Sequence, residues 1–581
     1  MSVHRLATSM RAAMCGTIGE SDIDSRLRLC GWVARRRDHG EHLFFLDLRD
    51  HTGVVQCVLE RSTDLRSEQV VSIEGTVRRR PQGTANPKIP TGEIELYDCS
   101  VEILADAKTP PIQVEGEAEA EESVRLRYRY IDLRRPRMQS NLRLRSKVTS
   151  SLRATMERNG FVEVETPLLW SPTPEGAREF AVPSRLRPGC FYVLPQSPQL
   201  AKQLLMVGGI DRYYQVARCM RDEDPRADRA FEFTQLDMEA SFVTQDDVIA
   251  LVSEAVADAT EAVGGVRPDF ATITWSEAMA RYGTDKPDLR LGMEIAQVSE
   301  VFAATALRAF QAPCVKAILV EGGAAMGRGR IDALVEAARG LGAEGLAWFR
   351  VKDASSVDSP LARHMDPAEL SGLLERTGAK PGDLVLVVAG EARLCSRVLG
   401  QLRSGLGQLG ADGALRFVWV VDFPMFEGPD ESGVPQAAHH PFTMPRTQDL
   451  ESLETDPMAV IAQAYDLVVN GWELGSGSVR IHQSDIQSRV FGALGIDERE
   501  AQSRFGFLLE AFAYGAPPHA GFAFGIDRLV AVLAGEESIR EVIAFPKSQS
   551  GADPLTGAPK ELSPSALLEL GIQVRAARER R

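Results

Sequence analysis

Five short runs of alternating apolar and polar residues fill the segment between residues 27 and 105. They are 27–33, 43–48, 53–59, 70–77 and 93–104, and glycine, proline and asparagine lie between them. Alternation with a period of two is typical of strands that bury one face. Five strands in so short a segment predict a small closed barrel, for which an OB-fold is the natural candidate.

The whole chain is too long for one hydrophobic core, because it has 581 residues. Helical spacing over 141–158 ends at Asn159-Gly160, and a predicted strand at 161–166 stops before Pro167. The acidic stretch 115–122 is typical of a solvated linker. Between 290 and 415, Ala- and Gly-rich helical segments alternate with strands such as 315–320 and 384–388, which indicates an inserted α/β domain.

These patterns predict a multidomain α+β protein. We divide it into an N-terminal OB-fold β-barrel (1–110), a hinge (111–140), the first part of a central domain (141–289), an inserted α/β domain (290–417), the second part of the central domain (418–555) and a C-terminal extension (556–581).

Composition and charge exclude several classes of protein. No apolar run approaches the roughly 20 residues of a membrane span, and eight scattered cysteines without a Cys-x-x-Cys pair argue against disulfides and structural zinc. We therefore expect a cytoplasmic protein with reduced thiols and no membrane partner. The net charge is −15, yet basic patches at 35–37, 78–80 and 125–147 could hold phosphates; each patch could equally be a solvated charged surface.

Two segments carry the most chemical information. In 213–239, a strand ends in Arg221-Asp222-Glu223-Asp224, and a second strand returns with Gln235, Asp237 and Glu239 on one face. An arginine at the mouth of such a hairpin can bind a carboxylate and a phosphate through its fork of donors. In 521–528, Gly525 lets a ligand approach the backbone, and Arg528 opens a predicted helix. Taken alone, the first segment could be a surface hairpin with salt bridges and the second a structural helix start.

A nucleotide enzyme of the glycine-loop type is disfavoured, because the sequence has no P-loop and no dinucleotide fingerprint. Together, the helix and strand ending at Pro167, the 213–239 hairpin and the 521–528 segment resemble, in order and spacing, the three signature motifs of class II aminoacyl-tRNA synthetases. Four further segments are similar to those of the bacterial aspartyl enzymes: 171–178, 196–202, 438–442 and 475–481. The inserted domain at 290–415 resembles one that those enzymes carry and the asparaginyl and lysyl enzymes lack.

The resemblance implies an antiparallel-sheet catalytic domain that activates L-aspartate with ATP and Mg²⁺ and transfers it to tRNA. It implies three catalytic residues, Arg221, Glu473 and Arg528. ATP would lie against Arg221, Asp222, Glu223, Phe233, Glu473, Gly525, Ile526, Asp527 and Arg528. Glu473 and Asp466 would hold the metal, as hard oxygen ligands suit Mg²⁺. Aspartate would lie against Glu175, Ser197, Gln199, Lys202, Arg221, Asp237, His439 and Arg480, because a buried carboxylate needs cationic partners.

The resemblance also assigns an anticodon site to the barrel, formed by His39, Gly83, Phe45, Gln56 and Arg37. The family usually has a leucine at the place of His39 and a bulkier residue near Gly83 in enzymes restricted to tRNA(Asp). We therefore expect charging of both tRNA(Asp) and tRNA(Asn) and a functional link to a glutamine-dependent amidotransferase. The resemblance also implies a homodimer, with the helix and strand around Pro167 at the subunit contact. An enzyme restricted to tRNA(Asp), an asparaginyl or lysyl enzyme and a catalytically silent tRNA-binding paralogue are the alternatives.

Two departures from the family pattern are visible. Ala230 stands where a glutamine usually contacts ATP, which predicts one nucleotide contact fewer. The segment 40–45 is one residue longer than usual, so either Phe44 or Phe45 could be the aromatic residue that stacks on the anticodon; we favour Phe45.

Overall fold

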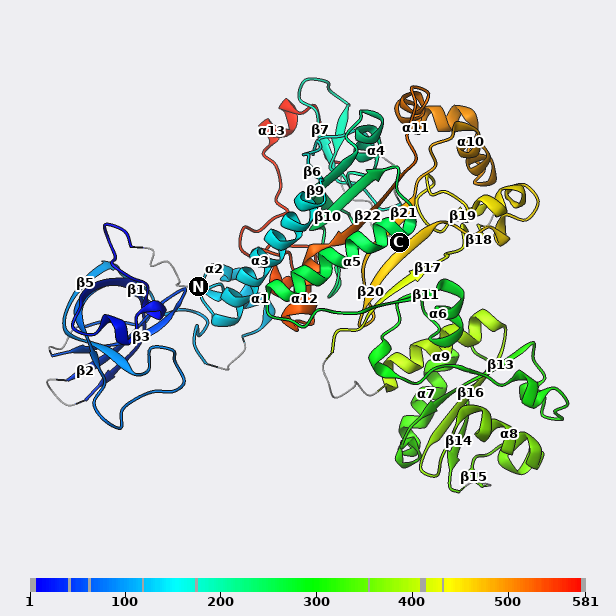
Figure 1. Cartoon of the computed structure of the whole chain (residues 1–581), viewed down its shortest axis with the longest axis horizontal. Helices are drawn as coiled ribbons and strands as arrows, with labels where there is room; N and C mark the ends of the chain where they lie inside the picture. The colour runs from blue at the N-terminus through cyan, green and yellow to red at the C-terminus, as the bar shows by residue number, and fades with distance from the viewer. Residues whose placement is uncertain are drawn as a thin grey trace. The chain divides into compact units, whose positions relative to one another are not determined.

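The computed structural model describes residues 7–39, 43–60, 64–116, 120–172, 176–353, 356–407, 414–430 and 433–575 (Figure 1). The chain forms two compact units. One contains the chain up to Leu144 together with Arg540–Glu561, and the other contains Arg145–Ile539 and the segment from Leu562 onward. Within the described residues, no helix is both long enough and apolar enough to cross a membrane.

The first unit contains the predicted barrel. Its five strands close in the order β1-β2-β3-β5-β4, and their inward side chains, such as Val33, Leu46 and Ile73, are fully buried. The OB-fold prediction is confirmed. The strands are β1 (Arg26–Asp38), β2 (Phe44–Asp50), β3 (Gly53–Leu59), β4 (Val70–Arg79) and β5 (Ile94–Ala105).

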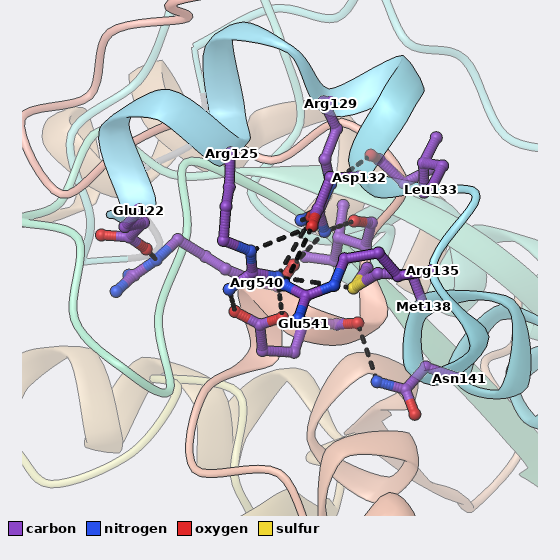
Figure 2. Close-up of polar contacts among 12 residues, drawn as sticks. Glu122, Arg125, Arg129, Asp132, Leu133, Arg135, Met138, Asn141, Arg540 and Glu541 are labelled. Carbon is purple, nitrogen blue, oxygen red and sulfur yellow. Dashed lines mark hydrogen bonds and ion pairs between the residues drawn. The ribbon is translucent and has the colours of Figure 1, made fainter. Parts of the chain in front are cut away.

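A buried cluster of charges links two distant segments of this first unit (Figure 2). Arg125 of α1 (Glu122–Arg127) pairs with Asp132 at 3.1 Å and with Glu541 at 2.6 Å. Arg129 of α2 (Arg129–Asp132) pairs with Asp132 at 2.6 Å and donates hydrogen bonds to the carbonyl groups of residues 540, 543 and 544. Part of the basic stretch 125–147 therefore stabilises the fold and is not available to bind phosphates.

The second unit is built on an eight-stranded sheet with the order β11-β17-β20-β21-β22-β10-β9-β6. Its central pairs are antiparallel, and only the two edge pairs, β11–β17 and β6–β9, are parallel. The strands are β6 (Val162–Glu163), β9 (Arg212–Met220), β10 (Glu232–Ser241), β11 (Phe270–Thr274), β17 (Phe417–Val421), β20 (Ala464–Val469), β21 (Trp472–Val479) and β22 (His519–Gly525).

Helices cover this sheet, and several lie close to β10. The helix α3 (Pro136–Arg158) ends at Asn159-Gly160, as the sequence predicts, and Gly160 adopts a positive φ of 78°. The strand that follows is shorter than predicted, because only Val162 and Glu163 pair. The remaining helices of this layer are α4 (Gln199–Val207), α5 (Gln245–Ala262), α10 (Ser484–Ala493), α11 (Glu498–Phe512) and α12 (Ile526–Ala534).

The residues between β11 and β17 form an insertion with its own sheet and its own hydrophobic core. Helices alternate with strands as predicted, but every strand pair is antiparallel, in the order β12-β13-β16-β14-β15. The elements are α6 (Trp275–Arg281), β12 (Ala296–Gln297), β13 (Cys314–Val320), α7 (Arg328–Gly340), β14 (Ala347–Val351), β15 (Val357–Asp358), α8 (Pro367–Thr377), β16 (Leu384–Gly390) and α9 (Ala392–Leu406).

Candidate active site

A cleft of about 360 Å³ opens over the middle of the eight-stranded sheet. Strands β10, β21 and β22 and helix α4 supply much of its walls, together with Arg221 just after β9. Thirteen of the residues that the sequence singles out line it: Ser197, Gln199, Lys202, Arg221, Glu223, Phe233, Asp237, His439, Glu473, Arg480, Gly525, Asp527 and Arg528. Segments that are up to about 330 residues apart in the sequence thus form one site.

Four fully buried charges form the floor of the cleft. The Lys202 ammonium group lies 3.0 Å from Asp237 and 3.1 Å from Glu239. Arg480 approaches Glu239 at 3.0 Å and donates a hydrogen bond of 2.6 Å to Ser478 Oγ. All four charged side chains are at most 5% exposed. Two cations and two carboxylates therefore balance in a medium where an unpaired charge would be costly.

The two carboxylates differ in their pKa values. Burial alone raises the pKa of Glu239, but Arg480 and Lys202 outweigh this effect and lower it to about 2. Burial raises the pKa of Asp237 to about 6 despite the attraction of Lys202. Asp237 Oδ1 and Gln199 Nε2 are buried and have no hydrogen-bond partner. An acceptor and a donor are thus left free for a ligand in this cleft.

Two neutral histidines, His439 and His440, also line the cleft. Burial lowers the pKa of His439 to about 4 and that of His440 to about 3, so both rings are uncharged at neutral pH. His440 Nδ1 accepts a hydrogen bond of 3.2 Å from the Phe442 amide. His439 packs edge-on against Phe423 at 4.7 Å. Each ring can therefore offer one donor or one acceptor without adding charge.

Two arginines, Arg221 and Arg528, also line the cleft. The Arg221 guanidinium stacks over the Phe233 ring at 5.1 Å from its centroid. Arg528 donates hydrogen bonds to the carbonyl groups of Glu473 (2.6 Å) and Asp228 (3.1 Å). Planar guanidinium groups held in this way are suited to phosphate groups, and an aromatic ring at the same place can stack on a base.

Three of the residues predicted to bind ATP either have protein partners or do not line the cleft. The Asp527 carboxylate accepts a hydrogen bond of 2.7 Å from the Thr234 amide and pairs with Arg145, so it ties α12 and α3 to β10. Ile526 is fully buried in the core, and Asp222 lies outside the walls of the cleft. The predicted residue Glu175 lies outside the described part of the chain.

The carboxylates of Glu473 and Asp466 fit a magnesium ion. Asp466 is 5% exposed, and its Oδ1 atom has no hydrogen-bond partner. Burial, followed by repulsion from Glu473, raises the pKa of Asp466 well above its usual value. The described residues contain no group of three or more His, Cys, Asp or Glu side chains that could hold a metal by themselves. This donor set suits Mg²⁺, which keeps water and phosphate oxygens among its ligands.

Comparison with known proteins decides the family. The class II tRNA synthetase (D, K and N) family matches residues 121–549, and the OB-fold nucleic acid binding domain matches residues 27–104. The chain belongs to the class II tRNA synthetases. As the sequence predicted, it is therefore an aminoacyl-tRNA ligase, and enzymes of this class use ATP.

Curated relatives align over almost their whole length. The Aspartate--tRNA(Asp/Asn) ligase of Acidothermus cellulolyticus is 49% identical, and the match covers 97% of each chain. The enzyme of the same name from Halothermothrix orenii is 47% identical over 97% of this chain and 98% of that protein. Among solved structures, the asparaginyl-tRNA synthetase from Pyrococcus horikoshii complexed with asparaginyl-adenylate has a TM-score of 0.58 at 18% identity, covering 92% of this chain and 98% of that one. This likeness shows the fold.

The barrel of this synthetase presents the residues predicted to read an anticodon. Phe44 points into the barrel core, whereas Phe45 lies on the outer face, where His39 packs edge-on against it at 5.6 Å. Arg37 donates hydrogen bonds to Asp47 at 2.6 Å and to Gln56 at 3.1 Å. Gly83 lies in a separate turn with a φ of +83°, and a side chain added there would meet no atom within 4 Å.

The sequence interpretation missed three residues of the catalytic site. Glu239 pairs with both buried cations, His440 lines the cleft beside His439, and Lys286 pairs with Glu473 at 2.6 Å. The alternation of Gln235, Asp237 and Glu239 was the available signal for Glu239, because residues two apart on a strand share one face. No periodic signal could have indicated Lys286, which lies in the loop after α6.

We predict that Lys202→Met destabilises the catalytic sheet by about 3–5 kcal/mol, because two buried carboxylates lose a partner. Thermal unfolding combined with hydrogen exchange of β10 and β21 measures this effect. Arg281→Met is the matched control, since its partner Glu294 is 50% exposed, and it should cost less than about 1 kcal/mol. Equal protection of β10 in the Lys202 variant and the control would show that the buried network is not stabilising.

Proposed function

We propose that this synthetase is an aspartate–tRNA ligase of the cytoplasm. It joins L-aspartate to ATP, forming aspartyl-adenylate and pyrophosphate, and then transfers the aspartyl group to the terminal hydroxyl of a tRNA. The observation that carries the proposal is the pair of buried cations, Lys202 and Arg480, that line the cleft. The names of the curated relatives, which are 47–49% identical over nearly the whole chain, support it.

The buried cations select an acidic side chain. A bound aspartate brings a second carboxylate into the cleft, and Lys202 and Arg480 already lie there with their own acids at about 3 Å. Asparagine would direct an NH₂ donor at Arg480, which can only donate, so it is rejected by mismatched hydrogen bonding. Asp237 Oδ1 accepts a hydrogen bond from the α-ammonium group, and Gln199 and Ser197, which line the same cleft, orient the substrate.

The same cleft positions the nucleotide. Phe233 stacks on the adenine, and Arg221, which is already held over that ring, bridges the α-phosphate and the substrate α-carboxylate. Arg528 lies against the γ-phosphate. Ala230 lines the cleft but offers no hydrogen bond, so the nucleotide has one contact fewer here than in the usual family pattern.

Catalysis then depends on positioning and on charge. The aspartate α-carboxylate attacks the α-phosphorus in line, and pyrophosphate leaves from the opposite side. Arg221 and Arg528 neutralise the charge that develops on the phosphate oxygens. A magnesium ion held by Glu473 and Asp466 supplies further charge neutralisation when it is bound. No side-chain nucleophile is needed in this scheme.

We expect Arg480→Leu to abolish aspartate activation while ATP binding survives. The variant would have to bury both the substrate carboxylate and Glu239 with one cation fewer, which costs on the order of 2–5 kcal/mol. Aspartate-dependent ATP–pyrophosphate exchange and equilibrium binding of ATP are the two measurements. Near-normal exchange in the variant would refute the proposed aspartate site.

The tRNA specificity rests on the barrel. The anticodons of tRNA(Asp) and tRNA(Asn) differ only at the last base, where C presents an amino donor and U a carbonyl acceptor. His39 can donate or accept a hydrogen bond, and Gly83 leaves open space where a side chain would stand. We therefore propose that both tRNAs are charged, with Phe45, Arg37 and Gln56 as the remaining anticodon contacts. Asp-tRNA(Asn) would then require a glutamine-dependent amidotransferase.

Charging assays with transcripts of both tRNAs test this specificity. We expect comparable charging of tRNA(Asp) and tRNA(Asn), and a shift of His39→Leu toward tRNA(Asp), because enzymes restricted to tRNA(Asp) usually have a leucine at this place. Charging of tRNA(Asn) about a thousandfold less efficiently would refute the dual specificity. An unchanged ratio in the His39 variant would remove that residue from the explanation.

We also propose a homodimer formed around the edge of the catalytic sheet. The edge strand β6 exposes Val162, and Leu168 and Leu169 just after Pro167 are about half exposed. Apolar residues clustered at an open sheet edge are suited to a two-fold contact with a second copy. Leu168→Arg combined with Leu169→Arg should shift the mass measured by light scattering from dimer to monomer. A monomeric and fully active wild-type enzyme would contradict the proposal.

A further inference from the structure

Lys286 lies beside one of the two carboxylates proposed to hold magnesium, in a cavity that shares Glu473 with the catalytic cleft. Its ammonium group is 2.6 Å from Glu473 Oε2. Asp285 and Asp466 line the same cavity. Asp466 meanwhile keeps a buried oxygen atom without a partner. One protein cation therefore stands among three carboxylates, two of which are the proposed magnesium ligands.

The loop that carries Lys286 is held by the inserted domain. Gly283, three residues earlier, has a φ of +69°, and a side chain there would collide with the Ser396 carbonyl of α9 at 2.0 Å. Gly400, one turn further along α9, would collide in the same way with the Gly283 carbonyl at 2.8 Å. Backbone thus packs directly on backbone, which only glycine permits.

A buried arginine of α9 secures the other end of the same loop. Arg403 is 1% exposed, and it donates hydrogen bonds to the carbonyl groups of Asp288 at 2.7 Å and Gly292 at 3.0 Å. Its guanidinium also stacks over the Tyr282 ring at 4.9 Å. No acidic side chain in the described residues pairs with it, so its hydrogen-bonding capacity is directed at the backbone of this loop. Residues 282–292 are therefore fixed to α9 on both sides of Lys286.

We infer that Lys286 is a resident counter-ion of the metal site, held in place by the inserted domain, and that it keeps free divalent cations out until ATP delivers one. This inference rests on the proposed role of Glu473 and Asp466 as magnesium ligands. Two carboxylates alone would attract free Mg²⁺, whereas an ammonium group at 2.6 Å neutralises one of them and repels a second cation. The phosphates of ATP add the negative charge that lets a metal ion displace this pairing. Lys286 is a positioning residue in this account, and it does not contact the reacting atoms.

Manganese binding measured by electron paramagnetic resonance tests the inference on the full-length enzyme without nucleotide. We expect weak binding to the wild type and binding at least about tenfold tighter to Lys286→Met, equivalent to about 1.4 kcal/mol. Lys286→Arg, which keeps the charge, should behave like the wild type. Arg403→Met should tighten binding in the same direction but less, because it only loosens the loop. Arg339→Met, on an exposed face of α7 in the inserted domain, is the control and should change nothing.

Unchanged Mn²⁺ affinity in Lys286→Met, or tight nucleotide-free binding to the wild type, would overturn the inference. Adding Glu473→Gln to Lys286→Met should abolish the gained binding, and if it does not, the ion is bound elsewhere and the inference is wrong. Failure of the proposed function has a different signature, namely a wild-type enzyme that shows no aspartate-dependent pyrophosphate exchange. The nucleotide-free measurements are independent of that result.

Discussion

The structure of the catalytic unit depends on one cluster of four buried charges, namely Lys202, Asp237, Glu239 and Arg480. Each charge lies within about 3 Å of an opposite one, and none is more than 5% exposed. Such a cluster is stable only when every member is held in register, because a single misplaced charge leaves its partner unpaired in a medium of low dielectric. The antiparallel sheet meets this demand: β10 supplies both acids, and Arg480 directly follows the paired strand β21.

The fixed positions of these charges suit a site with two proposed tasks, which are binding the amino acid and binding the nucleotide. The buried part of the site carries balanced charges, which we propose recognise the amino acid. Arg221 and Arg528 are held by an aromatic ring and by backbone carbonyls rather than by buried acids. Their charge is thus available to phosphates. Glu473 pairs with Lys286, and the loop that carries Lys286 is bound by Arg403 of α9. The inserted domain therefore contacts the proposed metal site through this loop.

Local patterns predicted much of the fold. The barrel follows from strand alternation alone, and the end of α3 follows from Asn159-Gly160. The period of two also decides between the neighbouring aromatics, because Phe44 is drawn into the core and Phe45 must then face outward. The antiparallel pairing of the inserted sheet was not predictable in this way, because alternating helices and strands suit either direction of pairing.

Contacts between distant segments could not be predicted from the sequence, because local patterns carry no information on which segments meet in the fold. Arg125 and Glu541 are 416 residues apart, and the partners of Glu239 come from positions 202 and 480. Only tertiary structure can show that the basic residues at 125 and 129 are neutralised internally. The sequence likewise could not show that the carboxylate of Asp527, which lines the cleft, pairs with the Thr234 amide and Arg145.

We propose that the buried cations Lys202 and Arg480 make this synthetase specific for an acidic amino acid. Pyrophosphate exchange with the wild-type enzyme, run side by side with aspartate, asparagine and lysine, tests it most directly. We expect exchange with aspartate and a rate at least about a thousandfold lower with either of the other two, because a site built around buried polar groups rejects a mismatched partner strongly. Comparable exchange with asparagine or lysine would contradict it.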